Sequence, residues 1–149
     1  MKIDSAIRLA RSQDIPACAA IVNHWIDETD WLPRVHTPEE VARHYKDVIY
    51  RNCKILVVAA KERVIGFVAL DPDHTIVSLH VLGNFRSQGV GHLLLENARI
   101  EFPNHMQLWT FQNNVRAQAF YQREGFAVVN QTDGDNEEGL ADLLMEWRA

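Results

Sequence analysis

The chain has 149 residues, of which 47% are hydrophobic and 23% charged, a composition typical of one globular domain with its own core. Its formal net charge of −5 argues against a nucleic-acid-binding protein, because no basic stripe is present to neutralise phosphates. No apolar run approaches the roughly 20 residues that span a bilayer, and residues 1–10 lack the apolar core of a signal peptide. Two cysteines, Cys18 and Cys53, are too few for a disulfide framework, so we expect reduced thiols. Together these features predict one cytoplasmic domain, residues 1–149, without a membrane partner.

The first part of the chain is predicted to hold one strand and two helices. Residues 6–10 alternate apolar and polar side chains as a strand does, and apolar residues recur at helical spacing over 15–26. Ser12 is the predicted N-cap of this first helix. The run TPEE at 37–40 has the form of a capping box with proline in the first turn, so a second helix is expected from there to about residue 50.

Six strands and two helices are predicted in the rest of the chain. Helices are predicted over 92–102 and 113–124, the second ended by Gly125. The three residues 61–63 are predicted to form a hairpin loop, although this loop lacks the glycine such loops prefer. Strands are predicted over 54–60, 64–70, 75–81, 106–111, 126–132 and 140–147. This order of elements predicts an α/β domain with a mixed sheet.

The stretch RSQGVG, Arg86 to Gly91, lies between a predicted strand and a predicted helix. A glycine after a strand often supplies only a positive φ, and a lone Gly-x-Gly is weak evidence for phosphate binding. At a strand-to-helix junction, however, free backbone N–H groups and the helix dipole form an anion site. The loop matches neither a P-loop, because it has no Gly-Lys-Ser/Thr, nor a dinucleotide fingerprint, because a third spaced glycine is missing.

Two spaced motifs give the sequence a family resemblance. Residues 86–91 fit Arg/Gln-x-x-Gly-x-Gly/Ala, and a second motif, Asn-x-x-Ala-x-x-Phe-Tyr-x-x-x-Gly-Phe, follows downstream. The second motif is fitted by Asn114, Ala117, Phe120, Tyr121, Gly125 and Phe126. Across nearly its whole length the chain therefore resembles the GNAT superfamily of acyl-CoA N-acyltransferases, although Gly83 and Ser87 replace a common proline and a common glycine. The resemblance implies a single-domain GNAT-like α/β fold, with about six or seven mostly antiparallel strands and about four helices.

The resemblance also implies acetyl-CoA as the acyl-donor co-substrate. In the family, backbone N–H groups of the glycine loop hold the pyrophosphate of coenzyme A. The residues that inherit this role are Arg86, Ser87, Gln88, Gly89, Val90, Gly91 and His92. The pantetheine arm is implied to pair with the backbone of Leu79 and Val81, and Asn114 to hydrogen-bond the same arm.

Acyl transfer to an amine needs a deprotonated amine, N–H donors for the oxyanion and a proton for the leaving thiolate. The resemblance implies that backbone N–H near Val81 serves the oxyanion and that Tyr121 is the proton donor. No general base is assigned, and deprotonation through a water chain stays open. Histidine has a pKa suited to the task, yet alternation points His80 away from the face of Val81, which favours a structural role. Thr75 and Val77, which alternation places on that face, cannot abstract a proton.

Two segments, residues 23–36 and 133–139, are expected to border the acceptor. Trp25 and Trp31 offer an apolar or cation–π wall, and Trp31 is the stronger candidate because it lies in an irregular loop. Acidic residues that would attract a cationic amine are Asp27, Glu28, Asp30, Glu137 and Glu138. Trp31 and Glu137 are the predicted substrate-binding residues, and the alternative is core tryptophans beside a solvated acidic loop.

No metal site is expected from the sequence. The seven histidines show no His-x-x-x-His spacing and no paired cysteines accompany them. The acidic run at 133–139 also fails the EF-hand pattern, since Glu138 stands where the loop needs glycine and Leu144 where it needs glutamate.

The sequence therefore favours an N-acetyltransferase that moves the acetyl group of acetyl-CoA to a primary amine by direct attack, with a small molecule as the expected acceptor. One alternative is a non-catalytic coenzyme-A-binding or regulatory module of the same fold. Another is an enzyme acting on a protein N-terminus or lysine, which predicts an open acceptor groove where a small-molecule enzyme should have an enclosed pocket. The oligomeric state stays open, a homodimer included.

Overall fold

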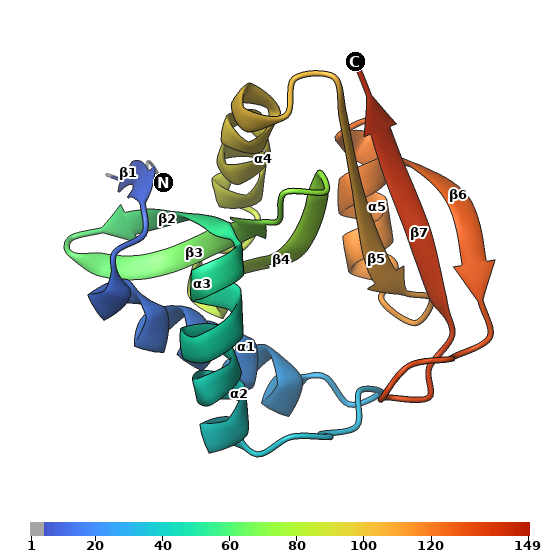
Figure 1. Ribbon diagram of the computed structural model, residues 1–149, viewed down its shortest axis with the longest axis horizontal. Helices are drawn as coiled ribbons and strands as arrows, with labels where there is room; N and C mark the ends of the chain where they lie inside the picture. Colours follow the sequence, from blue (N-terminus) through green and yellow to red (C-terminus); the bar gives the residue numbers. More distant parts are fainter. Residues whose placement is uncertain (1–4) are drawn as a thin grey trace.

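The computed structural model describes residues 5–149, which form one seven-stranded sheet flanked by helices (Figure 1). The strand order is β1-β2-β3-β4-β5-β7-β6, and all described neighbours are antiparallel except β4 and β5. The strands are β1 (Ser5–Leu9), β2 (Lys54–Ala60), β3 (Arg63–Leu70), β4 (Thr75–Val81), β5 (His105–Phe111), β6 (Ala127–Thr132) and β7 (Asp142–Arg148). The α-helices are α1 (Ile15–Glu28), α2 (Pro38–His44), α3 (Tyr50–Asn52), α4 (Val90–Glu101) and α5 (Val115–Arg123), and the other helical turns are η1 (Ser12–Asp14), η2 (Tyr45–Ile49) and η3 (Gly83–Phe85). The predicted fold class is confirmed.

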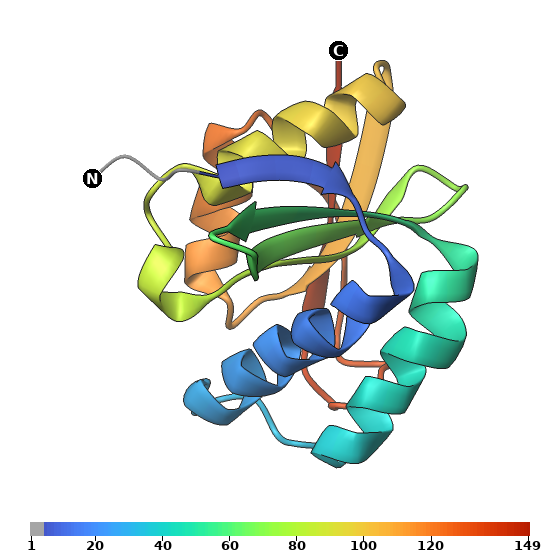
Figure 2. The same ribbon diagram turned by 90° about the vertical axis from the view of Figure 1, so that its left-hand side faces the viewer.

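Helices cover both faces of the sheet (Figures 1 and 2). On one face, α1 and the helix running through α2, η2 and α3 enclose a core that includes Cys18 and Phe67. On the other face, α4 and α5 pack over a core that includes Leu94 and Tyr121. Since β3 lies between these two cores, its residues from Val64 onward are all buried. Burial on both faces explains why this strand is a continuous apolar run in the sequence.

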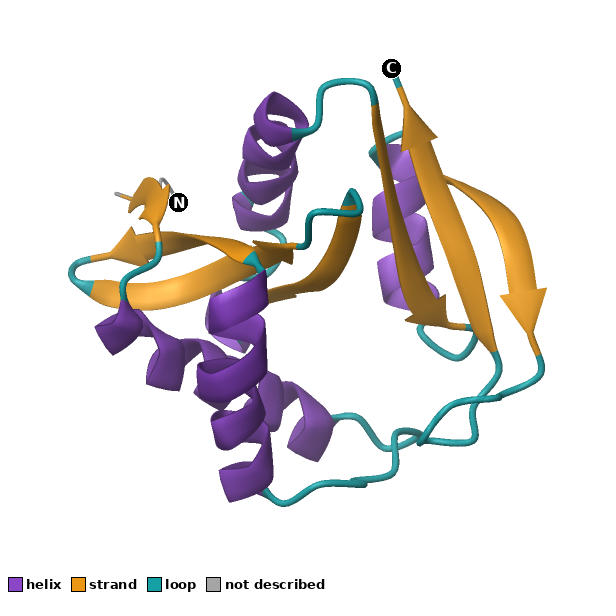
Figure 3. Cartoon of the chain, viewed as in Figure 1, coloured by secondary structure: helices purple, strands orange, loops and turns teal. Residues whose placement is uncertain are grey.

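The sheet opens in its middle because the stretch over which β4 pairs with β5 is short. They pair in parallel at Thr75–Gln107 and Ile76–Leu108. Beyond these pairs the two strands diverge, which leaves a gap between the two halves of the sheet (Figures 1 and 3). The edge of β4 that faces the gap therefore keeps backbone groups without a strand partner.

A β-bulge at Val77 overturns one prediction about β4. Strict alternation placed Thr75 and Val77 on the same face as Leu79 and Val81, but the register between β3 and β4 shifts by one residue at this point. In the structure Ile76 is the buried residue that joins the α4–α5 core with Leu79 and Val81. Val77 is 41% exposed.

Two local predictions fail at turns. The β2–β3 loop has two residues, Lys61 and Glu62, and both have positive φ (50° and 66°), as the tightest hairpin turns require. Ser12 is not the N-cap of the first helix, because it lies within the η1 turn. The carboxylate of Asp14 instead accepts the N–H of Arg11 at 2.8 Å.

Asp14 is a buried carboxylate that Arg8 neutralises. The Arg8 guanidinium donates to both Asp14 oxygens, at 2.6 and 3.0 Å, and lowers the pKa of Asp14 to about 2. A carboxyl whose pKa is lower in the folded state stabilises the fold above its unfolded pKa of about 3.9, and this contribution disappears as the pH falls through the folded pKa. We expect Asp14→Asn to lower the free energy of unfolding by about 2 kcal/mol at neutral pH.

The difference in unfolding free energy between wild type and Asp14→Asn should shrink as the pH falls from about 4 towards 2. Urea denaturation of both proteins across that range measures it. A difference that stays constant with pH would contradict the assigned pairing of Asp14 with Arg8.

Neither cysteine is placed as a reactive nucleophile. Cys18 is fully buried, and burial raises the pKa of its thiol to about 12. Burial also raises the pKa of Cys53, and both residues are free thiols. Among the described helices, none combines the length and the apolar character needed to cross a membrane.

Candidate active site

A cavity of about 1340 Å³ fills the gap between β4 and β5. It runs from the loop before α4 and the inner side of α5 to the end of α1 and the segment that follows it. Among the sequence-predicted site residues, those that line it are Leu79, Val81, Arg86, Ser87, Gly89, Gly91, His92, Asn114, Tyr121 and Trp31. The structure therefore brings both motifs to a single cavity, together with Trp31 and the other acceptor-side candidates Trp25, Glu28 and Asp30. Gln88, Val90 and Glu137 do not line it.

The loop before α4 presents a row of free backbone donors. None of the N–H groups of residues 87–92 donates a hydrogen bond to another residue of the described chain. Gly89 has a φ of 86°, and a Cβ built on it meets no atom within 4 Å, so the space beside it is open. Ser87 also has a positive φ, of 63°, where the family pattern has glycine. Free N–H groups at a helix N-terminus suit an anion such as a pyrophosphate.

Gly91 is needed for a different reason. A Cβ on Gly91 would lie 2.9 Å from the Phe120 ring, too close for two carbon atoms. The absence of a side chain therefore lets α4 approach α5, and it links the two sequence motifs through direct packing. Val90, also in the first motif, is buried in the core beneath this contact.

Arg86 is held by groups outside the loop. Its Nε donates to the Val81 carbonyl at 3.2 Å, and its guanidinium forms an ion pair with Glu28 at the end of α1. Gln88 likewise turns back, donating from Nε2 to the Asn84 carbonyl at 3.1 Å. These side chains fix the conformation of the loop, and the backbone N–H groups are left as its anion donors.

The outer edge of β4 has backbone groups that point into the gap. The N–H of Leu82 donates to the Ile65 carbonyl of β3 at 2.8 Å, so in this antiparallel pair the groups of Leu82 and His80 face β3. By alternation, the N–H and C=O groups of Leu79 and Val81 point away from β3, towards β5. An extended polar chain in the cavity can pair with them as an additional strand would.

Helix α5 supplies Asn114 and Tyr121. Asn114 is the N-cap of α5: its Oδ1 accepts the N–H of Ala117 at 3.1 Å, which leaves its amide NH₂ free within the described chain. Tyr121 is 7% exposed, packs against Phe120 and Phe126, and lines the cavity. Burial raises the pKa of Tyr121, so its phenol stays protonated at physiological pH. Its hydroxyl has no hydrogen-bond partner among the described residues.

Four rings gather at the other end of the cavity, and we call them the aromatic wall: Trp25, Trp31, Phe111 and His80. The Trp25 ring centroid lies 5.0 Å from that of His80 and 6.4 Å from that of Trp31. Trp31 in turn contacts Phe111, at the end of β5, with centroids 5.9 Å apart. The wall thus runs from β4 through α1 and the following loop to β5, across the gap.

Comparisons with known proteins give a family match over most of the chain. The model of the Acetyltransferase (GNAT) family matches residues 19–126, which include both motifs. The chain belongs to the GNAT acetyltransferase family. It is 26% identical over 144 residues, 95% of each chain, to the peptidyl-lysine N-acetyltransferase YiaC of Escherichia coli.

Solved GNAT structures share the fold. The solution structure of apo YjaB from Escherichia coli superposes with a TM-score of 0.79 at 22% identity, covering 96% of this chain and 97% of that one. The structure of yncA from Salmonella typhimurium, a putative acetyltransferase with its cofactor acetyl-CoA, has a TM-score of 0.73 at 20% identity, covering 97% and 93%.

His80 is poorly suited to be the general base of this GNAT protein. It packs between Trp25 and Phe67 on the α1 face of β4, as alternation predicts. Burial and, to a lesser degree, the charge of Arg86 lower the pKa of His80 to about 4. Moving a proton to it from an ammonium of pKa about 10.4 is uphill by roughly six pKa units, or about 8 kcal/mol. His80 is therefore neutral at pH 7, and the base of this GNAT protein stays unassigned.

The two acceptor segments meet, but Glu137 does not line the cavity. His36, before α2, pairs with Glu137, before β7, at 2.8 Å, and the interaction raises the pKa of His36. This contact joins two loops that lie side by side below the gap (Figure 3). Asp27 pairs with Arg34, and Glu28 with Arg86, whereas Asp30 lines the cavity without an ion-pair partner among the described residues.

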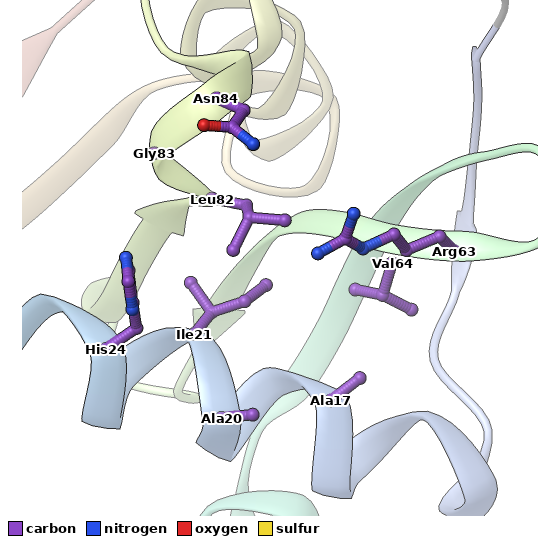
Figure 4. Close-up of a pocket in the computed structure, with 9 residues that line it drawn as sticks. All are labelled: Ala17, Ala20, Ile21, His24, Arg63, Val64, Leu82, Gly83 and Asn84. Carbon is purple, nitrogen blue, oxygen red and sulfur yellow. The ribbon is translucent and has the colours of Figure 1, made fainter.

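The structure has two further features. His92, Glu96 and Glu124 bring potential metal ligands within 4.8 Å of one another, but Arg99 pairs with both carboxylates, at 2.6 and 3.3 Å. The expected lack of a metal site therefore stays a prediction. A separate groove of about 430 Å³ lies between α1, β3 and η3 (Figure 4). It shares no lining residue with the large cavity and has no carboxylate among its lining residues.

Sequence reasoning missed Phe111 and Glu124, which also line the cavity. Phe111 is the last residue of β5, and ligands commonly bind beyond the carboxyl ends of parallel strands. That rule gave a usable signal for Phe111. Glu124 follows α5 and has no comparable signal, since its position depends on Arg99 and His92 of α4.

The double role of Asn114 can be separated by substitution. Asn114→Asp keeps an oxygen to cap α5 but removes the amide NH₂, while Asn114→Ala removes both. We expect Asn114→Ala to lose about 1 kcal/mol of unfolding free energy and Asn114→Asp to lose little. Both variants should bind acetyl-CoA about 5- to 10-fold more weakly, which is the loss of affinity expected when one hydrogen bond to the ligand is removed. Thermal melts and calorimetric titration measure the two effects, and unchanged affinity in Asn114→Asp would rule out the coenzyme contact.

Proposed function

We propose that this protein transfers the acetyl group of acetyl-CoA directly to a primary amine, and that its acceptor is the side chain of a lysine in a protein or peptide. The observation that carries the proposal is the single cavity in which a row of free loop N–H groups, the outward backbone of β4 and the Tyr121 hydroxyl lie together. An acyl-CoA has a matching order of groups: a pyrophosphate, an amide-bearing arm and a thioester.

The proposed reaction follows from the positions of these groups. The amine nitrogen attacks the thioester carbonyl, and the oxyanion that forms is stabilised by backbone N–H near Val81. The C–S bond then breaks, and the leaving sulfur takes a proton from the Tyr121 hydroxyl. The acylated nitrogen loses a proton, and this proton restores the Tyr121 hydroxyl. Because the pKa of Tyr121 is raised, the phenol donates only as the thiolate charge develops.

The lysine acceptor is supported by the relative YiaC, which is named a peptidyl-lysine N-acetyltransferase and aligns over 95% of this chain. A small-molecule amine is the second candidate. It is favoured by the His36–Glu137 contact, which joins the two loops expected to border the acceptor.

The test is an acetylation assay with purified protein, [¹⁴C]acetyl-CoA and two acceptor sets: a mixture of short lysine peptides with blocked N-termini, and a panel of small primary amines. Faster label transfer to the lysine peptides supports the proposal. Transfer to small amines alone would establish the second candidate. Binding of acetyl-CoA without transfer to any amine would leave a coenzyme-binding module and overturn the proposed activity.

A further inference from the structure

The acceptor end of the cavity has an unusual composition for a site that receives a charged amine. Its surface there is formed by the aromatic wall, whose four rings come from α1, the loop after it, β4 and β5. Trp25 and Trp31 are only partly buried although their rings contact others, so part of each ring borders the cavity. Methylene groups pack against an apolar aromatic wall, and cations bind over the faces of its rings. A peptide group placed against the wall loses its hydrogen bonds to water, which costs free energy.

The spacing of the rings matches one kind of acceptor. His80 neighbours Val81, whose outward N–H lies where the thioester is proposed to bind. Trp31 lies further along the wall, between Trp25 and Phe111, and follows Asp30 in the loop after α1. The Trp25 and Trp31 centroids are 6.4 Å apart. The four-carbon stem of lysine spans roughly 6 Å when extended. A lysine whose nitrogen lies beside Trp25, the ring next to His80, therefore has its backbone near Trp31.

We propose that the aromatic wall, and Trp31 in particular, selects acceptors whose amine is carried on an unbranched methylene stem, so that a lysine ε-amine is preferred to shorter side-chain amines and to the α-amine of a chain terminus. This inference rests on the proposed function. An α-amine has no stem, so reaching the thioester would force its own peptide groups against the rings, where they lose hydrogen bonds to water.

A stem-length series tests the inference. The acceptors are blocked tripeptides, N-acetyl-glycyl-X-glycinamide, with X as lysine, ornithine, diaminobutyrate or diaminopropionate, together with alanyl-glycinamide as the α-amine. For the wild type we expect kcat/KM to fall about fourfold for each methylene removed, the factor expected for burial of one CH₂. In Trp31→Ala the fall should weaken to about twofold per methylene, while Trp31→Phe should retain most of the wild-type dependence.

Comparing the wild type with the Trp31 variants removes the effect of the amine pKa from the series. The amine pKa changes with stem length, but wild type and variant see the same peptides, so that effect cancels in the ratio of their slopes. Val35→Ala is the matched control, because Val35 lies in the same loop, is 44% exposed and does not line the cavity. It should keep the wild-type slope. Unchanged affinity for acetyl-CoA in all variants shows that the fold and the donor site are intact.

The outcomes separate this inference from the proposed function. If no acceptor is acetylated by the wild type, the proposed function fails, and the inference fails with it. If transfer occurs but Trp31→Ala keeps the wild-type slope, the proposed function stands and the aromatic wall does not select the stem. A flat wild-type series, or faster transfer to the α-amine than to lysine, also overturns the inference.

Discussion

The Tyr121→Phe variant is expected to lose about 100- to 1,000-fold in kcat while binding acetyl-CoA with unchanged affinity. The substitution removes only the hydroxyl, which has no hydrogen-bond partner among the described residues, and it keeps the ring packed between Phe120 and Phe126. The fold should therefore be undisturbed, and the loss should fall on protonation of the departing thiolate. Release of free thiol at saturating acetyl-CoA measures kcat, and calorimetry measures binding.

Tyr50→Phe provides the control for the Tyr121 experiment, because it makes the same change on an exposed tyrosine of α3, outside the cavity. It should leave kcat unchanged. Equal turnover by Tyr121→Phe and wild type would remove Tyr121 from the mechanism, and water would then be the proton donor.

Gly89→Glu is expected to weaken acetyl-CoA binding at least 100-fold. The carboxylate would enter the open space beside the free N–H groups of residues 87–92, where the pyrophosphate is proposed to lie. Two like charges about 4 Å apart near a protein surface repel by about 4 kcal/mol. Gly89→Ala adds the strain of a side chain at positive φ without the charge, so its loss of affinity should be far smaller.

Gly139→Glu is the matched control for Gly89→Glu. Both glycines have positive φ, and neither would bring a Cβ within 4 Å of another atom, so the backbone strain of the two substitutions is comparable. Gly139 lies in the β6–β7 loop and does not line the cavity. Calorimetric titration should show near wild-type affinity for Gly139→Glu. An equal loss in both variants would mean that strain, and not the anion site, explains the effect.

The donor half of the site could be predicted from the sequence because the two motifs that carry the family resemblance are local. A glycine loop between a strand and a helix has free N–H groups wherever it occurs, and the spacing of Asn114 and Tyr121 places both on one short helix. The order of the elements was also predictable, since each strand and helix has its own apolar period. Whether these residues bind the coenzyme remains a prediction.

The acceptor half could not be predicted in the same way, because its contacts join distant parts of the chain. Arg86 pairs with Glu28, and Trp31 contacts Phe111, across separations that no local pattern encodes. Glu137 was predicted from its charge to bind the amine, but its carboxylate pairs with His36 outside the cavity. The bulge at Val77 lies in the pairing of β4 with β3, which strict alternation does not include, so alternation alone gave the wrong face for Thr75 and Val77.

The parallel pairing of β4 with β5 spans just Thr75–Gln107 and Ile76–Leu108. A hydrogen-bonded seam this short makes the central join of the sheet a place where the chain can open locally, and an open chain is accessible to proteases. A ligand that fills the gap opposes such opening, by about 2.7 kcal/mol when its concentration is 100 times its Kd. If that ligand is acetyl-CoA, saturating acetyl-CoA should slow the proteolysis of the purified protein.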